Sequence, residues 1–142
     1  MPDLNKTYLY RMTHIENVPH ILEHGVTHVS STHTNKSYKA IGDNSIISTR
    51  NNFDLPNGNK LGNYIPFYFG ARMPMLYVIQ KGYNGVSITP AKDIVYCISS
   101  VQKIVDHNLP FCFPVGMQLM DCPIFMSKKI YLKLIQFLIK RP

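Results

Sequence analysis

The stretch that decides the fold is Asn63-Tyr-Ile-Pro-Phe-Tyr-Phe-Gly-Ala-Arg-Met-Pro-Met-Leu-Tyr-Val-Ile-Gln80. Its aromatic and β-branched residues predict a strand over 64–69, Gly70 and Pro74 interrupt that strand, and residues 75–79 predict a second one. Two strands joined by so tight a break form a corner with aromatic faces. Such a corner can hold a flat ring, although aromatic runs are more often buried as core. The pattern therefore leaves a ligand site and plain core packing both open.

Length and composition indicate one folded domain over residues 1–142, without repeats, low-complexity tracts or linkers. The hydrophobic fraction of 45% and the charged fraction of 16% exclude a disordered chain. The net charge of +7 favours an anionic partner such as nucleic acid. Cys97, Cys112 and Cys122 form no CxxC pair, which favours reduced thiols in a cytoplasmic protein. No apolar run has the length of a signal segment or a membrane span, so we expect no membrane association.

Two histidines raise the question of a metal site. His20 and His24 are four residues apart on an expected helix, a spacing that suits a metal ion. The residues between them do not form the HExxH arrangement, and no cysteine is nearby. We therefore expect surface or helix-end histidines and no bound metal.

The rest of the chain predicts an α+β domain with short elements and two long loops. A strand is expected over Tyr8–His14, and a helix over Glu16–Gly25 with Asn17 as its N-cap and with Val18, Ile21 and Leu22 as its apolar face. The other expected elements are a loop over 29–42, a helical or irregular segment over 43–52, a loop over 51–60, a turn over 81–85, a strand over 93–99, a short helix or turn over 101–105, a strand over 109–116, and a tail over 127–140 whose period suits a helix or a buried strand.

Three blocks of sequence carry a resemblance to a known family. They are Tyr10–Asn17 with Ile21-Leu22 and Gly25; Arg50-Asn51 with Leu55-Pro56, Tyr64–Phe69 and Pro74–Tyr77; and Ile94–Tyr96 with Ser99-Ser100 and Leu109–Phe113. In this order they resemble the DarT DNA ADP-ribosyltransferase toxins. The resemblance implies an ADP-ribosyltransferase fold, with a split, mostly antiparallel β core around an NAD cleft.

The resemblance also implies an activity and its residues. Members of the family split NAD and attach ADP-ribose to a base of single-stranded DNA, as the toxin of a toxin–antitoxin system whose antitoxin has ADP-ribosyl-hydrolase activity. The backbone of Arg11, Met12 and Thr13 corresponds to the nicotinamide-binding strand, and Arg50 to the catalytic arginine. Residues 37–50 correspond to the NAD-binding element, and Tyr68 either stacks on nicotinamide or supports the cleft wall. Arginine suits this role because its planar fork binds phosphate oxygens.

One position departs from the family pattern. The resemblance predicts a catalytic glutamate before a short apolar strand, and the best match, residues 134–139, places Gln136 there. Glutamine has no negative charge to stabilise an oxocarbenium-like state and cannot act as a general base, so its presence costs on the order of 10²–10⁴ in rate. The segment between Phe113 and Gln136 is also shorter than in the family, and the chain ends soon after it, so we expect a C-terminally shortened domain.

Three hypotheses follow from these observations. The first is an ADP-ribosyltransferase that acts on DNA and is weakened or inactivated by Gln136. The second is a pseudoenzyme that binds NAD or single-stranded DNA without turnover. The third is a basic nucleic-acid-binding domain whose aromatic side chains stack on bases, which predicts salt-sensitive binding that is indifferent to NAD.

Overall fold

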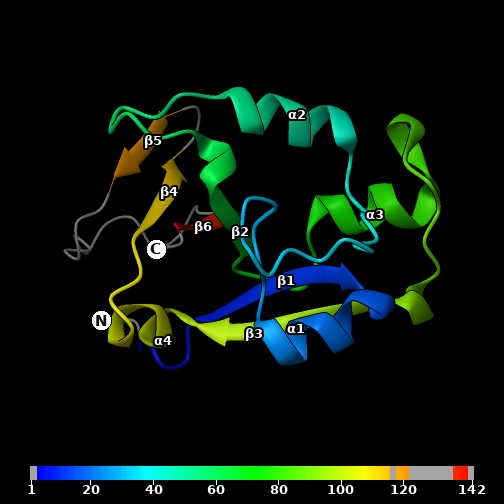
Figure 1. Ribbon diagram of the computed structural model, residues 1–142, viewed down its shortest axis with the longest axis horizontal. Coiled ribbons are helices and arrows are strands. Elements are labelled where there is room, and N and C mark those ends of the chain that lie inside the picture. The colour runs from blue at the N-terminus through cyan, green and yellow to red at the C-terminus, as the bar shows by residue number, and fades with distance from the viewer. Residues whose placement is uncertain (1–2, 116–117, 122–135, 141–142) are drawn as a thin grey trace.

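The computed structural model describes residues 3–115, 118–121 and 136–140 (Figure 1). The strands are β1 (Tyr8–His14), β2 (Tyr64–Tyr68), β3 (Ile94–Ser100), β4 (Phe111–Val115), β5 (Gln118–Asp121) and β6 (Gln136–Lys140), and the α-helices are α1 (Val18–His24), α2 (Asn44–Asn52), α3 (Pro74–Lys81) and α4 (Val101–Asp106). Single 3₁₀ turns are η1 (Ile15–Asn17), η2 (Leu61–Asn63), η3 (Tyr83–Gly85) and η4 (Ala91–Asp93). Among the described residues, no helix is long and apolar enough to cross a membrane.

The six strands form one antiparallel sheet in the order β3-β1-β2-β6-β4-β5. β1 pairs with β3 along its whole length, from Tyr8 to His14. Its pairing with β2 on the other side is confined to Tyr10 opposite Tyr68. The sheet therefore divides between β1 and β2, and the split antiparallel α+β core predicted from the sequence is confirmed.

Pro66 explains part of this division. Residues two apart along a strand direct their backbone groups to the same edge, so Tyr64, Pro66 and Tyr68 share one edge of β2. The edge that carries the Pro66 carbonyl faces β1, because this carbonyl accepts a hydrogen bond from Arg11 of β1. Proline has no N–H to donate to a neighbouring strand. The ladder between β1 and β2 therefore lacks a donor two residues before Tyr68.

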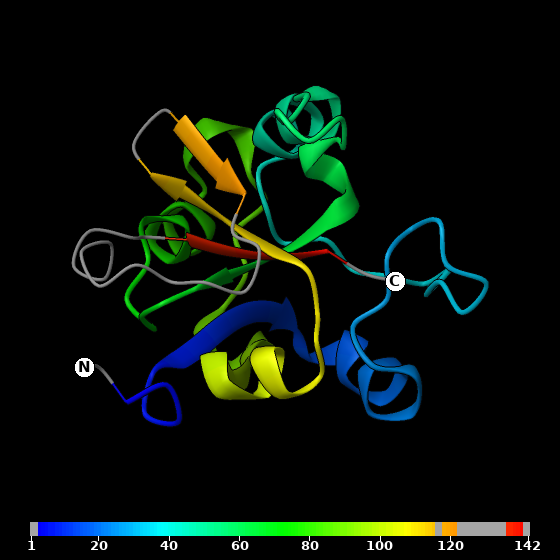
Figure 2. The same cartoon turned by 90° about the vertical axis from the view of Figure 1, so that its left-hand side faces the viewer.

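The main core lies where α4 packs against the sheet. Leu9 of β1 and Val101 of α4 are both 0% exposed. The cluster that they form consists of Leu9, Ile65, Phe67, Val101, Ile104 and Phe111. Burial of each such side chain contributes about 1.5–3 kcal/mol. A smaller cluster of Leu55, Tyr64 and Cys112 lies beside η2. Helices α1 and α4 lie on one side of the molecule and α2 on the opposite side (Figures 1 and 2).

Most expected elements are confirmed, but the strand predicted over 75–79 is wrong. These residues belong to the helix α3. Pro74 occupies the first turn of α3, where its missing N–H costs nothing, and Gly82 ends the helix with a left-handed φ of 68°. Met75 and Ile79 are four residues apart, so one helical face carries both toward the interior. Helix period and capping therefore override the β propensity of this apolar run.

Two details of the first helix also differ from the prediction. Asn17 makes no capping hydrogen bond to α1, because its buried side chain bonds to Thr13 and Lys39 instead. Leu22 is 82% exposed and does not join the apolar face of α1.

The sequence left the period of the tail over 127–140 open between a helix and a buried strand. The structure has a strand, β6, over Gln136–Lys140. Residues 127–135 of the expected tail lie outside the described residues.

A glycine allows α2 to approach η2. A Cβ atom built on Gly62 would lie 2.7 Å from the backbone Cα of Asn51, in the last turn of α2. Only glycine fits at such a distance without movement of the helix. Since Arg50 precedes Asn51, this contact helps to set the place of the arginine.

We predict that Gly62→Ala lowers stability by about 1–3 kcal/mol, because the added methyl group overpacks the contact between η2 and α2. Thermal unfolding followed by circular dichroism would measure the loss. Gly70→Ala is the matched control, since a Cβ at Gly70 meets nothing within 4 Å. Equal melting temperatures for the two variants would contradict the prediction.

Candidate active site

A cavity of about 520 Å³ opens at the division between β1 and β2. Its walls come from β1, α1, the connection between α1 and α2, α2 itself, β2 and α3. This volume falls within the range of about 300–1,000 Å³ that is usual for small-molecule sites. The split in the sheet thus creates a space large enough for a nucleotide-sized ligand.

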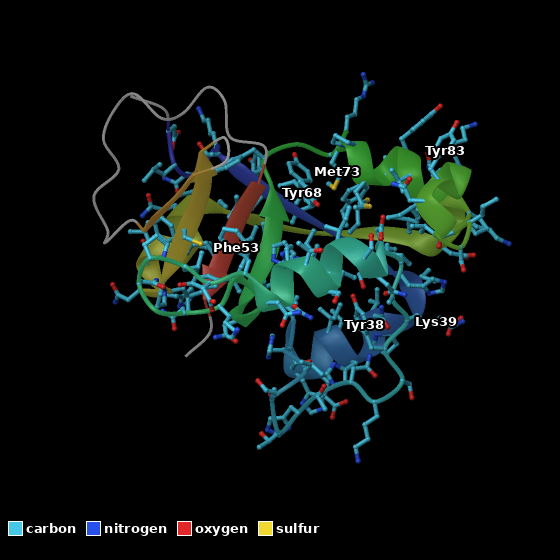
Figure 3. All side chains as sticks on the ribbon, turned by 90° about the horizontal axis from the view of Figure 1, so that it is seen from above. Tyr38, Lys39, Phe53, Tyr68, Met73 and Tyr83 are labelled. Atoms are coloured by element: carbon cyan, nitrogen blue, oxygen red, sulfur yellow. The ribbon has the colours of Figure 1, made fainter. Side chains whose placement is uncertain are left out.

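Five of the predicted site residues line this one cavity. They are Arg11, Met12 and Thr13 of β1, Arg50 of α2 and Tyr68 of β2, of which Tyr68 is labelled in Figure 3. The structure thus brings together residues that lie up to 57 positions apart in the sequence. Their assignment to NAD is taken up below.

The two arginines bond to backbone groups that a neighbouring strand would otherwise satisfy. Arg50 Nη2 donates to the carbonyl of Tyr64, and Arg11 Nη1 donates to the carbonyl of Pro66, each at 3.2 Å. Tyr68, the next residue on this edge of β2, pairs with Tyr10. The guanidinium groups therefore donate the hydrogen bonds that are missing from the ladder between β1 and β2. The sequence predicted a role for the backbone of Arg11 but not for its side chain.

The charge on these arginines is not neutralised by a carboxylate. Neither Arg11 nor Arg50 belongs to a salt bridge between residues that the structure describes. The Nε atom of Arg50 is buried and has no hydrogen-bond partner among them. Burial lowers the pKa of Arg50, and the nearby charge of Arg11 lowers it further, yet an arginine stays protonated at neutral pH. A cation that is partly removed from water is costly when one of its donors has no partner among the described residues, so the cavity is suited to an anion.

Tyr68 lies beside this charge as a neutral phenol. Burial raises its pKa, and the positive charges of Arg50 and Arg11 act in the opposite direction with smaller effect. A tyrosine with a raised pKa keeps its proton at neutral pH. The ring therefore offers the cavity an aromatic face and a hydroxyl group that can donate or accept a hydrogen bond.

Another part of the cavity lining is apolar. Ile46 and Ile47 in the first turn of α2 line it, together with Val29 and Tyr38 of the preceding loop. Their exposed fractions are 44%, 37%, 80% and 47%, values that leave considerable apolar surface open to solvent. Tyr38 is labelled in Figure 3 near α1 and α2. The cavity thus combines a cationic part with an exposed apolar part.

Sequence reasoning missed Asp43, which also lines the cavity. Asp43 is 4% exposed and is the N-cap of α2, where its carboxylate accepts hydrogen bonds from the backbone N–H of Ser45 at 2.8 Å and of Ile46 at 3.5 Å. These bonds hold the first turn of the helix that carries Arg50. An aspartate before a polar helical turn is a recognisable capping pattern, so the signal was present in the sequence.

Three histidines gather beside α1. The rings of His20 and His24 lie 4.8 Å apart, and His33 stacks on His24 at 5.0 Å. No group of three or more His, Cys, Asp or Glu residues within the described part of the chain could hold a metal ion. The histidines instead bring the loop after α1 against that helix.

Gln136 is the first residue of β6, and its backbone lies opposite Tyr68 of β2. Because β6 and β1 flank β2 on opposite sides, Gln136 is across β2 from Tyr10. The position predicted for the catalytic acid thus adjoins, through the backbone of β2, a residue that lines the cavity.

The family model for DarT, described as ssDNA thymidine ADP-ribosyltransferase, matches residues 10–122. The chain belongs to the DarT family. A DNA ADP-ribosyl transferase from Escherichia coli O127:H6 is 32% identical over 110 residues, which cover 76% of this chain and 50% of the relative. A DNA ADP-ribosyl transferase–DNA ADP-ribosyl glycohydrolase fusion protein from Thermosipho africanus is 40% identical over 70 residues, or 49% of this chain and 18% of the fusion protein. The chain spans about half the length of the E. coli family member.

Solved structures of the family share the fold. Thermus sp. 2.9 DarT in complex with ADP-ribosylated ssDNA superposes with a TM-score of 0.73 and 24% identity, over 95% of this chain and 75% of that one. The same protein in complex with NAD⁺ gives a TM-score of 0.65 and 24% identity, over 99% of this chain and 77% of that one. The family and the fold predicted from the sequence are both confirmed.

We predict that Asp43 makes stability depend on pH under acidic conditions. Hydrogen bonds, first of all from the Ser45 side chain, lower the pKa of Asp43 in the folded protein. The folded state therefore binds fewer protons than the unfolded state over this range, and the stabilisation present at neutral pH is lost as the pH falls below about 5. Melting temperatures between pH 7 and pH 3 would show this loss.

Asp43→Asn should flatten the acid dependence, since asparagine still caps the helix but does not titrate. Ser45→Ala, which removes only the hydroxyl donor, should give an intermediate slope. The same slope in all three proteins would exclude Asp43 as its source.

Proposed function

We propose that this chain transfers ADP-ribose from NAD to a base of single-stranded DNA, with thymidine as the target named for the family. The observation that carries the proposal is the buried Nε of Arg50, a cationic donor without a hydrogen-bond partner among the described residues, in a cavity that also holds Arg11 and an apolar part. A dinucleotide has the matching chemistry, because it joins two flat rings through an anionic pyrophosphate. Solved relatives carry NAD⁺ or modified DNA in their complexes.

The polarity of the cavity suggests how NAD would lie. Arg50, assisted by the charge of Arg11, binds the pyrophosphate. The nicotinamide amide bonds to the backbone of β1 near Met12 and Thr13, where β1 has lost β2 as a neighbour, and Tyr68 offers its ring as a stacking partner. The adenine lies at the apolar part, among Ile46 and its neighbours. The residues present thus fit the co-substrate at both of its ends.

NAD supplies a nicotinamide leaving group. Its bond to ribose C1′ breaks as a ring nitrogen of the DNA base forms a bond to that carbon, and the proton of this nitrogen passes to water. Positive charge develops on the ribose as the bond breaks. Arg50 contributes by holding the pyrophosphate, so that the reacting carbon is fixed in place. A neutral Tyr68 contributes a surface for the departing ring. Neither residue offsets the positive charge of the ribose, and this is where the family uses a glutamate.

Gln136 favours a second candidate, a pseudoenzyme that binds NAD without turnover. Its amide can accept a hydrogen bond from a ribose hydroxyl but carries no charge. The loss of a charged acid–base group accounts for about 10²–10⁴ in rate. Binding of NAD, which depends on the arginines, would survive this replacement. The two candidates therefore share a binding site and differ only in turnover.

The proposal extends to a partner protein, the extent of the domain and the cellular compartment. The fusion of a transferase to a DNA ADP-ribosyl glycohydrolase in a relative supports an antitoxin that removes ADP-ribose from DNA. We treat residues 1–142 as a single ADP-ribosyltransferase domain, because the family match runs through most of them. We assign the activity to the cytoplasm, in agreement with the free thiol of Cys97.

The test incubates the purified protein with labelled NAD and a mixed pool of single-stranded oligonucleotides. We expect weak labelling of DNA by the unmodified protein, an increase of about 10²-fold or more in Gln136→Glu, and loss of labelling in Arg50→Ala. Arg72→Ala is the matched control, since Arg72 is an exposed arginine that does not line the cavity. It should leave labelling unchanged.

The remaining outcomes separate the candidates. NAD binding by calorimetry without labelling, followed by labelling in Gln136→Glu, would identify a pseudoenzyme with an intact binding site. No NAD binding and no labelling by any variant would exclude both candidates. Equal activity in Arg50→Ala and the unmodified protein would remove the arginine from the mechanism.

A further inference from the structure

A long connection supplies much of the cavity wall. It runs between α1 and α2, and Figure 2 shows it in cyan, projecting to one side of the sheet. The residues of this loop that line the cavity are Val26, Thr27, His28, Val29, Thr34, Asn35, Tyr38, Ala40, Ile41 and Gly42. The loop contains turns but no helix or strand. Its place, and therefore the shape of the cavity, depends on a few side-chain contacts.

Asn17 makes the most deeply buried of these contacts. Its side chain is 0% exposed. Asn17 Nδ2 donates to the carbonyl of Lys39 at 2.8 Å, and Asn17 Oδ1 accepts from the backbone N–H of Lys39 at 2.9 Å. The side-chain amide thus forms the same pair of hydrogen bonds that a neighbouring strand would form with Lys39. A buried pair of this kind is expensive to lose, because both backbone groups would remain unsatisfied.

The same amide reaches β1. Asn17 Nδ2 also donates to the hydroxyl of Thr13 at 3.0 Å, and Thr13 is 1% exposed. Thr13 lies on the strand proposed to bind nicotinamide, whereas Lys39 lies on the loop that leads to α2 and Arg50. One side chain therefore joins the two walls of the cavity.

The other contacts of the loop are weaker or lie elsewhere. Lys39 Nζ forms an ion pair with Glu16 at 2.6 Å, but both side chains are more than half exposed, at 52% and 57%. Exposed ion pairs contribute little to stability. His28 Nε2 bonds to the carbonyl of Gly62 at 2.8 Å, near the start of the loop. The hydrogen bonds of Asn17 thus hold this end of the loop at Lys39, close in sequence to the buried side chains of Ile41 and Asp43.

We propose that Asn17 is a positioning residue for NAD. It fixes the loop at Lys39 against Thr13 and so forms the cavity before the co-substrate arrives. The consequence for NAD rests on the proposed function, whereas the anchoring of the loop does not. Pre-organisation of this kind improves affinity, because a loop already in place has little ordering entropy left to lose on binding.

The first measurement tests the anchor without any ligand. Hydrogen exchange at the Lys39 amide, followed by mass spectrometry or NMR, reports the bond that this N–H donates to Asn17. We expect exchange to be about ten-fold faster or more in Asn17→Ala, because the hydrogen bond that protects this amide is lost. Asn17→Asp keeps the volume but replaces the amide donor by an oxygen that faces the Lys39 carbonyl, and should behave similarly.

The control is Lys39→Met, which removes the ammonium group and the ion pair but keeps both backbone bonds to Asn17. Its exchange should match that of the unmodified protein. Amides of the core strand around Leu9 should remain protected in every variant, which separates local loosening from unfolding. Unchanged exchange at residue 39 in both Asn17 variants, with the core intact, would overturn the anchor.

The second measurement is NAD affinity by calorimetry. We expect about ten-fold weaker binding in Asn17→Asp and unchanged binding in Lys39→Met. A loosened loop with unchanged NAD affinity would overturn the positioning role. Failure of the unmodified protein to bind NAD would overturn both the proposed function and the proposed effect of Asn17 on NAD affinity. Hydrogen exchange would still decide whether Asn17 anchors the loop.

Discussion

The structure depends on how one edge of β2 satisfies its backbone. Buried carbonyl groups must find donors, and in an unbroken sheet β1 would supply them. Here β1 pairs with β2 only at Tyr10, and the guanidinium groups of Arg50 and Arg11 donate to the carbonyls of Tyr64 and Pro66. Had the ladder continued, the cavity would be closed by backbone. Two arginine side chains thus make hydrogen bonds that a neighbouring strand would otherwise make. This arrangement leaves the sheet open and places two positive charges in the opening, so the same contacts shape the fold and the cavity.

The place of Arg50 depends on contacts at both ends of α2. The last turn of the helix approaches η2 closely because Gly62 has no side chain, and the first turn is capped by Asp43. The loop before the helix is held by Asn17 through Lys39. Each contact involves only a few atoms, but together they fix a short helix that has no buried residue of its own. The helix is therefore held by polar contacts and close packing more than by an apolar face.

The sequence predicted those features of the fold and the site that depend on residues close together in the chain. Aromatic, alternating and apolar runs identified β1, β2 and β3, and the order of three sequence blocks led to the family and to five residues that share the cavity. The error at α3 could have been avoided, because Pro74 and Gly82 are ordinary helix-boundary signals. The role of Asn17 could not, since its partner Lys39 is 22 residues away and a capping role fitted the local pattern equally well. The side chain of Arg11 was unpredictable for the same reason: its partner on β2 is 55 residues away.

The charged groups of the cavity suit the proposed binding of NAD better than its cleavage. Asp43 is the one carboxylate among the cavity-lining residues that the structure describes, and its hydrogen bonds to the first turn of α2 commit it to capping. It is thus poorly suited to replace a catalytic glutamate. Gln136, opposite Tyr68 on β6, adds no charge. The groups that would hold a pyrophosphate are present, whereas a free negative charge to face an oxocarbenium-like ribose is absent from the described part of the cavity. In the proposed function, affinity for NAD and the rate of its cleavage would therefore depend on different residues.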